Sequence, residues 1–221
     1  MLLNFRDPIE TLIIMAAFVV AISVHEASHA ATANWLGDPT ARLMGRMTLN
    51  PLRHLDVLGT IFLVVVGFGW GKPVLVDERR LRHGRQGAAL VAAAGPLANL
   101  ATALLVVSVL VIAAVLGADV RGTWREAAGI LILISIILTA FNFLPIPPLD
   151  GFGALLGVLP GELAEQLERL RQYGPGILLA IFALNWILPI NLFWTVMSPL
   201  VEVIQQIIGL WEQGLRAVLL S

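Results

Sequence analysis

Long uncharged segments dominate this chain of 221 residues. The ranges 88–118, 127–149 and 174–201 contain no Asp, Glu, Lys or Arg, and each is at least as long as the roughly 20 apolar residues that cross a bilayer. Only 13% of the residues are charged, whereas a soluble domain carries about 25%. The mean hydropathy of +0.86 also indicates a protein of the lipid bilayer rather than a soluble one. The sequence therefore predicts an all-α polytopic protein of the cell membrane, in contact with the lipid bilayer.

The apolar runs predict about four transmembrane helices, over residues 8–35, 87–116, 127–144 and 174–189. The run 57–71 has 15 uncharged residues, which is short for a full span, and KPVLV (72–76) is typical of a short extended piece. We therefore expect 57–76 to be re-entrant. The residues from Pro199 onward predict an amphipathic C-terminal helix. Residues 1–221 are interpreted as a single intramembrane domain, with a core over about 10–155 and C-terminal helices over 161–221.

The distribution of basic residues predicts the orientation in the membrane. If 57–76 is re-entrant, the loops 37–56, 72–86 and 160–173 lie on one side and hold ten of the 14 Lys and Arg residues. Cytoplasmic loops carry an excess of Lys and Arg, so this side is expected to be cytoplasmic and the N-terminus extracytoplasmic. The motif SVHEASHA (23–30) and the motif PPLDG (147–151) then both fall in the cytoplasmic half of the bilayer.

Three ionisable side chains interrupt the first apolar run. Between Thr11 and Leu36 the ionisable residues are His25, Glu26 and His29. Two histidines four residues apart share one helix face and can bind one metal ion, and Glu26 can reach a water molecule beside that ion. Charged groups inside a membrane cost about 2.5–3.5 kcal/mol on insertion scales and usually serve a function. The pattern H-E-x-x-H predicts a catalytic zinc site with Glu26 as the general base.

A second motif, NFLPIPPLDG (142–151), offers a further ligand. Asp150 is the only acidic residue between Glu126 and Glu162. The prolines before it exclude a regular helix, and irregular backbone at membrane depth is tolerated where it lines a cavity or is buried in protein. A catalytic zinc needs three protein ligands, so we predict that Asp150 joins His25 and His29. The amide of Asn142 can donate to a developing oxyanion. A turn role for Asp150 and helix packing for Asn142 are the alternatives.

Composition excludes some functions. The net charge is −1, so no nucleic-acid partner is expected. Cysteine is absent, which excludes disulfides and thiolate ligands.

The motifs HEASH, AAAGPLAN and NFLPIPPLDG, in this order, closely resemble the site-2 protease family of intramembrane zinc metalloproteases. LNPLRHLDVLGT and GFGWGKPV also resemble its short bacterial and archaeal members, and the resemblance covers roughly residues 10–155. It implies one Zn²⁺ per chain bound by His25, His29 and Asp150, with Glu26 as the catalytic base and Asn142 assisting. It also implies substrates that are membrane-spanning proteins, cleaved within or near their spans in regulated intramembrane proteolysis. The chain is similar to the minimal form without a PDZ or CBS domain.

Three further residues are candidates for binding substrate or shaping the site. His54 lies in NPLRHLD beside the predicted re-entrant segment, and a capping or interfacial role is its alternative. Asn99 follows the Gly-Pro pair of AAAGPLAN; the resemblance favours a place near the active site, and helix packing is its alternative. Lys72 begins the extended piece 72–76, which could bind an unwound substrate by strand addition.

Two other functions would use the same intramembrane polar groups. A zinc or proton transporter would use the His, Glu and Asp side chains, but it would need a polar path across both leaflets. The outer parts of the second and third spans offer only serines for such a path. A catalytically inactive scaffold has no use for Glu26. Hydrolysis that depends on Glu26 would indicate the protease. Metal flux without hydrolysis would indicate the transporter.

Overall fold

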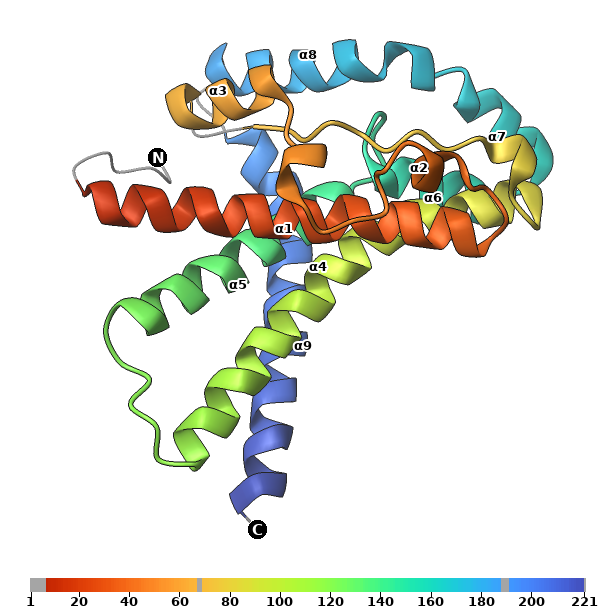
Figure 1. Ribbon diagram of the computed structural model, residues 1–221. Helices are drawn as coiled ribbons and strands as arrows, with labels where there is room; N and C mark the ends of the chain where they lie inside the picture. The colour runs from red at the N-terminus through yellow and green to blue at the C-terminus, as the bar shows by residue number, and fades with distance from the viewer. Residues whose placement is uncertain (1–6, 67–68, 188–190, 221) are drawn as a thin grey trace.

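The computed structural model describes residues 7–66, 69–187 and 191–220, and Figure 1 shows their arrangement. Helices make up the described fold; the described β-structure is a single isolated antiparallel bridge between Leu55 and Gly71. The prediction of an all-α polytopic protein is confirmed. The α-helices are α1 (Pro8–Trp35), α2 (Thr40–Leu43), α3 (Val57–Val66), α4 (Gly84–Val115), α5 (Thr123–Asn142), α6 (Asp150–Val158), α7 (Gly161–Glu168), α8 (Gly174–Ile187) and α9 (Leu192–Leu220).

Helix α1 covers the predicted range. Asp7 caps its first turn by accepting a hydrogen bond from the amide of Ile9 at 2.8 Å, and Pro8 occupies a first-turn position that needs no amide donor. Gly37 ends the segment with a φ of 109°, a conformation that favours glycine. Short 3-10 turns, η1 (Pro51–Arg53), η2 (Glu78–Arg80) and η3 (Arg171–Tyr173), lie in the connections.

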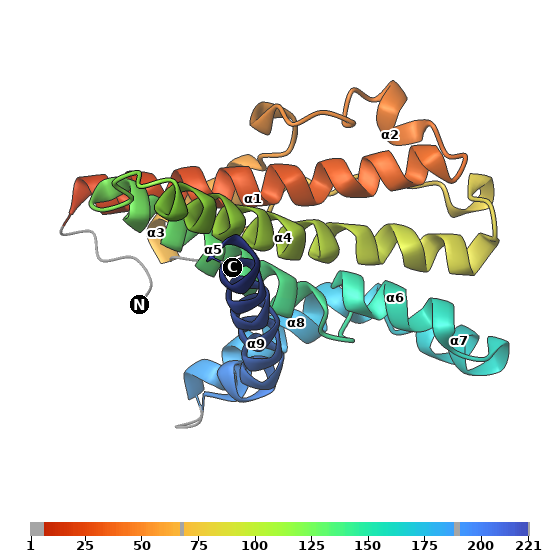
Figure 2. The same cartoon turned by 90° about the horizontal axis from the view of Figure 1, so that it is seen from below.

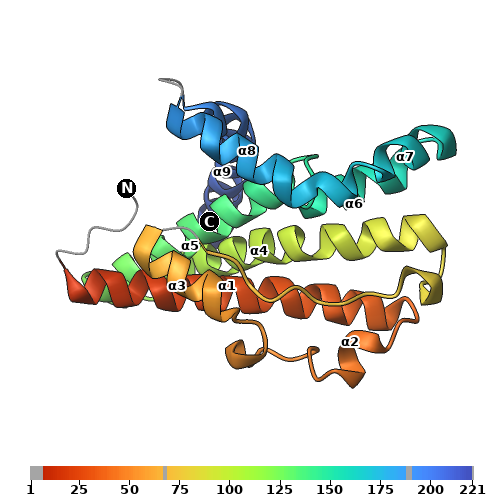
Figure 3. The ribbon, with the colours of Figure 1, turned by 90° about the horizontal axis from the view of Figure 1, so that it is seen from above.

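Helix α4 is the centre of the molecule. It packs against α1, α5, α6 and α9. Figures 2 and 3 show α1 between α4 and the irregular segment 37–56, with α6 and α7 on the opposite side of α4. The main apolar cluster joins α4, α5 and α9 and includes Val107, Val111, Ile136, Met197 and Val201. This packing fixes α4 as the element that both α1 and α6 contact.

Within the described part of the chain, four helices are long and apolar enough to cross a membrane: α1, α4, α5 and residues Phe193–Leu220 of α9. The chain is therefore a multi-pass membrane protein. The number agrees with the prediction, but the fourth candidate is α9. Helix α8 has 14 residues, and the predicted end of its span at residue 189 lies outside the described part of the chain. Helix α9 begins before Pro199, continues through it, and runs crosswise to α1 in Figures 1 and 2.

The predicted segment 57–76 consists of two parts, and its residues 67–68 lie outside the described residues. Helix α3 has 10 residues, which is too short to span a bilayer. Residues 72–76 are extended, without a regular strand partner. In Figure 3 this extended segment lies along α1. The re-entrant arrangement of this segment in a bilayer stays a prediction.

Candidate active site

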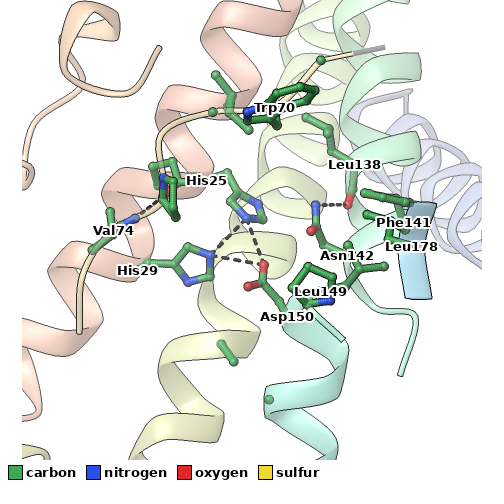
Figure 4. A pocket seen from close by; sticks show the side chains of 18 of the residues that line it. His25, His29, Trp70, Val74, Leu138, Phe141, Asn142, Leu149, Asp150 and Leu178 are labelled. Carbon is green, nitrogen blue, oxygen red and sulfur yellow. Dashed lines mark hydrogen bonds and ion pairs between the residues drawn. The ribbon is translucent and has the colours of Figure 1, made fainter. Parts of the chain in front are cut away.

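Helix α1 positions three of the predicted residues on its inner side. His25, Glu26 and His29 are 4%, 8% and 7% exposed, although all three are polar. Figure 4 shows both imidazoles pointing toward the carboxylate of Asp150. The spacing of four residues accounts for this, because it stacks the two histidines on one helix face.

Asp150 reaches the histidines because the chain breaks between α5 and α6. Residues 143–149 are irregular, as the prolines predict, and α6 begins at Asp150 and packs on α4. Gly151 permits the tight return: a Cβ there would lie 2.5 Å from the carbonyl oxygen of Leu144. Helix α6 itself was not predicted. Its sequence, DGFGALLGV, has three glycines, which lower helix propensity, so packing on α4 stabilises it.

The three side chains bring their ligand atoms together. Oδ2 of Asp150 lies 3.0 Å from Nε2 of His25 and 3.2 Å from Nε2 of His29, and the two nitrogens are 3.0 Å apart. Oδ2 is buried and accepts no hydrogen bond from the described residues. Tetrahedral zinc with bonds of about 2.0–2.1 Å places its ligand atoms about 3.3–3.4 Å apart. The triangle is close to this size, and two imidazoles with one carboxylate are a donor set that zinc accepts.

Second contacts orient the two rings. Nδ1 of His29 lies 2.7 Å from the carbonyl oxygen of Val91 on α4. A carbonyl can only accept, so Nδ1 carries the proton and Nε2 presents its lone pair toward Asp150. Nδ1 of His25 lies 3.2 Å from Nδ2 of Asn99, whose Oδ1 is buried without a partner. Rotating this amide by 180° would let Nδ1–H donate to Oδ1 and leave Nε2 of His25 free for a metal.

Gly95 is a part of the site that sequence reasoning missed. A Cβ at this position would lie 2.6 and 2.7 Å from Cε1 and Nε2 of His25, and closer still to Nε2 of His29. Real Cβ atoms do not approach other atoms so closely, so α4 can support both imidazoles only with glycine at this position. The small residues of AAAGPLAN predicted close helix packing, but they did not identify the imidazoles as the group that approaches.

Glu26 is not a member of the cluster of ligand atoms, and its carboxylate contacts the extended segment. Its Oε2 accepts a hydrogen bond from the amide of Val74 at 3.0 Å. Glu26 therefore follows His25 directly in sequence, but its hydrogen-bond partner is the amide of Val74 and not Asp150. This arrangement leaves its carboxylate beside the candidate metal site without making it a ligand.

A cavity of about 1960 Å³ opens over these residues. Its polar lining includes His25, Glu26, His29, Asn142 and Asp150, and Figure 4 shows part of it. Most of the wall is apolar and comes from α1, α5, α8 and residues 69–71 and 73–76. Nδ2 of Asn142 donates to the carbonyl oxygen of Leu138 at 3.0 Å, so the amide lies at the site but is bonded to its own helix.

The remaining predicted residues lie farther back. His54 is 0% exposed and does not line the cavity; its Nε2 lies 2.7 Å from the carbonyl oxygen of Thr48. Lys72 has an exposed side chain and also does not line the cavity, although its backbone joins the extended segment to His54. Asn99 is fully buried behind His25. None of these three residues lines the cavity, and a role for them in binding substrate or shaping the site stays a prediction.

Sequence comparison relates the chain to named proteins. It is 34% identical over 173 residues to "Putative zinc metalloprotease YwhC" of Bacillus subtilis, covering 76% of this chain and 79% of that protein. It is 31% identical over 175 residues to "Putative zinc metalloprotease Rip2" of Mycolicibacterium smegmatis, covering 74% and 63%. For the protein of the same name from Mycobacterium tuberculosis (strain H37Rv), the identity is 33% and the coverage 76% and 66%.

No protein-family model and no solved structure matches the chain. The similarity to YwhC nevertheless extends over most of both proteins, and the name of each relative given above is that of a zinc metalloprotease. The same chain carries an H-E-x-x-H motif on a buried helix, with a carboxylate beside both histidines. The chain belongs to the site-2 protease family of zinc metalloproteases.

Proposed function

We propose that this zinc metalloprotease cleaves peptide bonds within or near the membrane-spanning segments of other proteins. His25, His29 and Asp150 are the proposed zinc ligands, and Glu26 is the proposed general base. One observation carries the proposal. The three ligand atoms lie within 3.2 Å of one another on the wall of a large, mostly apolar cavity to which the candidate membrane helices α1, α4 and α5 contribute. A cavity of this kind suits an apolar peptide better than a polar one.

Glu26 carries the proton transfers in this mechanism. Its carboxylate takes up the proton that a water molecule loses on attacking the peptide carbonyl, and it returns this proton to the leaving amine. Bound zinc would supply Lewis-acid chemistry that lowers the pKa of water to about 7 and polarises the carbonyl. The hydrogen bond from Val74 holds the carboxylate of Glu26 in one orientation.

Asn142 is the proposed donor to the oxyanion. Its amide lines the cavity beside Asp150, but its Nδ2 donates to Leu138. Rotation about its side-chain bonds would free the N–H group for the developing negative charge. Such donors act in the transition state and typically contribute about 100-fold or more to kcat.

The extended segment is the proposed substrate-binding edge. Successive amides of an extended chain point to opposite sides. The amides of Lys72 and Val74 both donate inward, to His54 and Glu26. The N–H and C=O of Leu75, between Val74 and Val76, have no partner among the described residues, and Leu75 lines the cavity. This free edge supports binding of an unwound substrate by strand addition.

The charged end of the cavity is the proposed route for water. Glu78, Arg85, Glu168 and Arg171 line this end, and Arg171 forms ion pairs with Glu78 at 3.2 Å and Glu168 at 2.8 Å. These four residues come from two of the loops that are rich in Lys and Arg, 72–86 and 160–173. The positive-inside rule supports a cytoplasmic position for this end, with the N-terminus outside.

Cleavage in proteoliposomes tests the proposal. Purified protein is reconstituted with single-span test proteins, and mass spectrometry locates the cut. We expect a cut within or at the edge of the span for wild type and none for Glu26→Gln. Cleavage of soluble peptides alone would contradict the intramembrane assignment. Zinc uptake by the same vesicles without any cut would favour a transporter.

A further inference from the structure

Arg46 is a buried cation that forms no ion pair with a described acidic residue. Arg46 is 7% exposed, whereas the other described Lys and Arg residues are all exposed. None of the ion pairs among the described residues includes it. Arg is rarely buried unless it is paired, so its partners require an explanation.

The partners of Arg46 are two main-chain carbonyl groups. Its Nη1 donates to the carbonyl oxygen of Arg53 and, at 3.4 Å, to that of Lys72. These carbonyls belong to different stretches of chain. Arg53 follows Arg46 by 7 residues, and Lys72 follows it by 26 residues. The guanidinium therefore joins the irregular segment that precedes α3 to the extended segment that follows it.

The same two stretches are tied by backbone contacts. The amide of Lys72 donates to the carbonyl oxygen of His54 at 2.6 Å, next to the bridge between Leu55 and Gly71. The ring of His54 in turn contacts the carbonyl oxygen of Thr48. Arg46 adds to these contacts, because it binds the carbonyls of Arg53 and Lys72, which accept no backbone hydrogen bond from the described residues.

The position of Lys72 affects the proposed catalytic base, because Val74, two residues after Lys72, contacts Glu26. Lys72 is fixed by His54 and Arg46, and Val74 donates its amide to Glu26 at 3.0 Å. A shift of the extended segment at Lys72 would move this amide away from the carboxylate. We propose that Arg46 is a positioning residue, which holds segment 72–76 in register with Glu26. This inference rests on the proposed function, because it assigns the segment to that active site.

The chemistry of the side chain explains why arginine suits this position. A guanidinium is planar and always charged, and the two N–H groups of Nη1 serve the two carbonyl groups. Lysine keeps the positive charge on a flexible stem, whereas glutamine is neutral and shorter. We therefore expect Arg46→Lys to restore part of the function that Arg46→Gln loses.

A double-mutant cycle with Val74→Pro tests the inference. Proline at 74 removes the amide that binds Glu26, and the preceding residue lies outside any helix, where a following proline is tolerated. Arg46→Gln is expected to lower kcat about tenfold in the wild-type background, as for loss of a hydrogen bond to a charged group, and less than about twofold in the Val74→Pro background. Zinc content should stay unchanged. Arg42→Gln, which removes an exposed arginine of the same segment, is the matched control.

Equal losses in both backgrounds, or loss of zinc from Arg46→Gln, would overturn the inference and make Arg46 a general structural residue. The same holds if kcat does not change in Arg46→Gln. The cycle can be run only if wild type cleaves a substrate, so a second measurement does not depend on cleavage.

That second measurement uses the absence of native cysteine. A spin label at Leu75→Cys reports the mobility of the extended segment, and a label at Glu165→Cys on α7 serves as the reference. Arg46→Gln should make the label at 75 more mobile and leave the label at 165 unchanged. An unchanged spectrum at 75 would contradict the inference. If Arg46→Gln makes the label at 75 more mobile but wild type cleaves no substrate, the proposed function is overturned and the inference about Arg46 is not.

Discussion

The proposed zinc site and the extended segment 72–76 face the same cavity but are held in different ways. The ligand atoms come from α1 and α6, and both helices pack on α4 with glycine at the point of contact with the imidazoles. The extended segment depends on one bridge, the amides of Lys72 and Val74, and the guanidinium of Arg46. Packed helices keep metal ligands fixed, whereas a sparsely bonded edge can adapt to a peptide. Three substitutions test this difference and a fourth tests the far end of α1, in order of decreasing expected effect.

Asp150→Ala should have the largest effect, because it removes one of three proposed ligands. We expect metal content to fall below about a tenth of wild type. Cleavage should fall by more than the roughly 10–100-fold that loss of an outer-shell partner costs. Metal analysis of purified protein measures the first change. Asp119→Ala, in the exposed connection between α4 and α5, is the control. Full metal content in Asp150→Ala would exclude Asp150 as a ligand.

Gly95→Ala tests whether the site depends on close packing. The added Cβ must displace both imidazoles, and overpacking typically costs about 1–3 kcal/mol, which corresponds to about 5–150-fold in zinc affinity. Competition with a chelator measures this affinity. Gly129→Ala on α5 is a matched control, because a Cβ there meets no atom within 4 Å. Equal affinities in the two variants would show that α4 does not support the histidines.

Val74→Pro tests the extended segment without touching the ligands. It removes the amide donor to Glu26, and loss of a hydrogen bond to a charged group costs about 1.5–3 kcal/mol. We expect kcat to fall about tenfold or more, while zinc content stays at the wild-type level. Val74→Ala retains the amide and should remain within about twofold of wild type. If both variants lose activity equally, the side chain rather than the amide is responsible.

Asp38→Asn should have the smallest effect and concerns the far end of α1. Burial raises the pKa of Asp38, but hydrogen bonds from Thr40 and the amide of Asp77 outweigh this and hold the pKa below its usual range. A carboxylate with a lowered pKa stabilises the folded protein above the pKa of the unfolded chain, and this is lost as pH falls through the folded value. The variant should melt about 2–4 °C lower at pH 7.

The difference in melting temperature should shrink below about pH 4, where the carboxylate of the unfolded chain takes up its proton. Asp119→Asn, at an exposed position, should melt like wild type at both pH values. A constant difference across this pH range would mean that the side-chain geometry, and not the charge, stabilises this end of α1.

Local sequence patterns predicted the parts of the molecule that local rules determine. The spacing of His25 and His29 placed both on one helix face, and the prolines before Asp150 predicted the irregular turn that brings it to them. The bounds of α1 followed from Pro8 and Gly37. That Asp150 is a zinc ligand, and not only a neighbour of the histidines, stays a prediction.

Contacts between distant segments were not predictable in the same way. The sequence contains no signal that pairs Val74 with Glu26 or Arg46 with the carbonyl of Lys72. Helix α6 forms despite its glycines because α4 covers it, and tertiary packing overrides local propensity there. The role of Gly95 needed the positions of two side chains on another helix.

The central claim is that the buried cluster binds zinc for hydrolysis while Glu26 acts only as the base. Zinc content and cleavage of a single-span substrate, measured in one preparation of wild type and Glu26→Gln, test it most directly. The account predicts about one zinc per chain in both proteins and cleavage in wild type alone. Loss of zinc from Glu26→Gln, or cleavage that persists in it, would contradict the account.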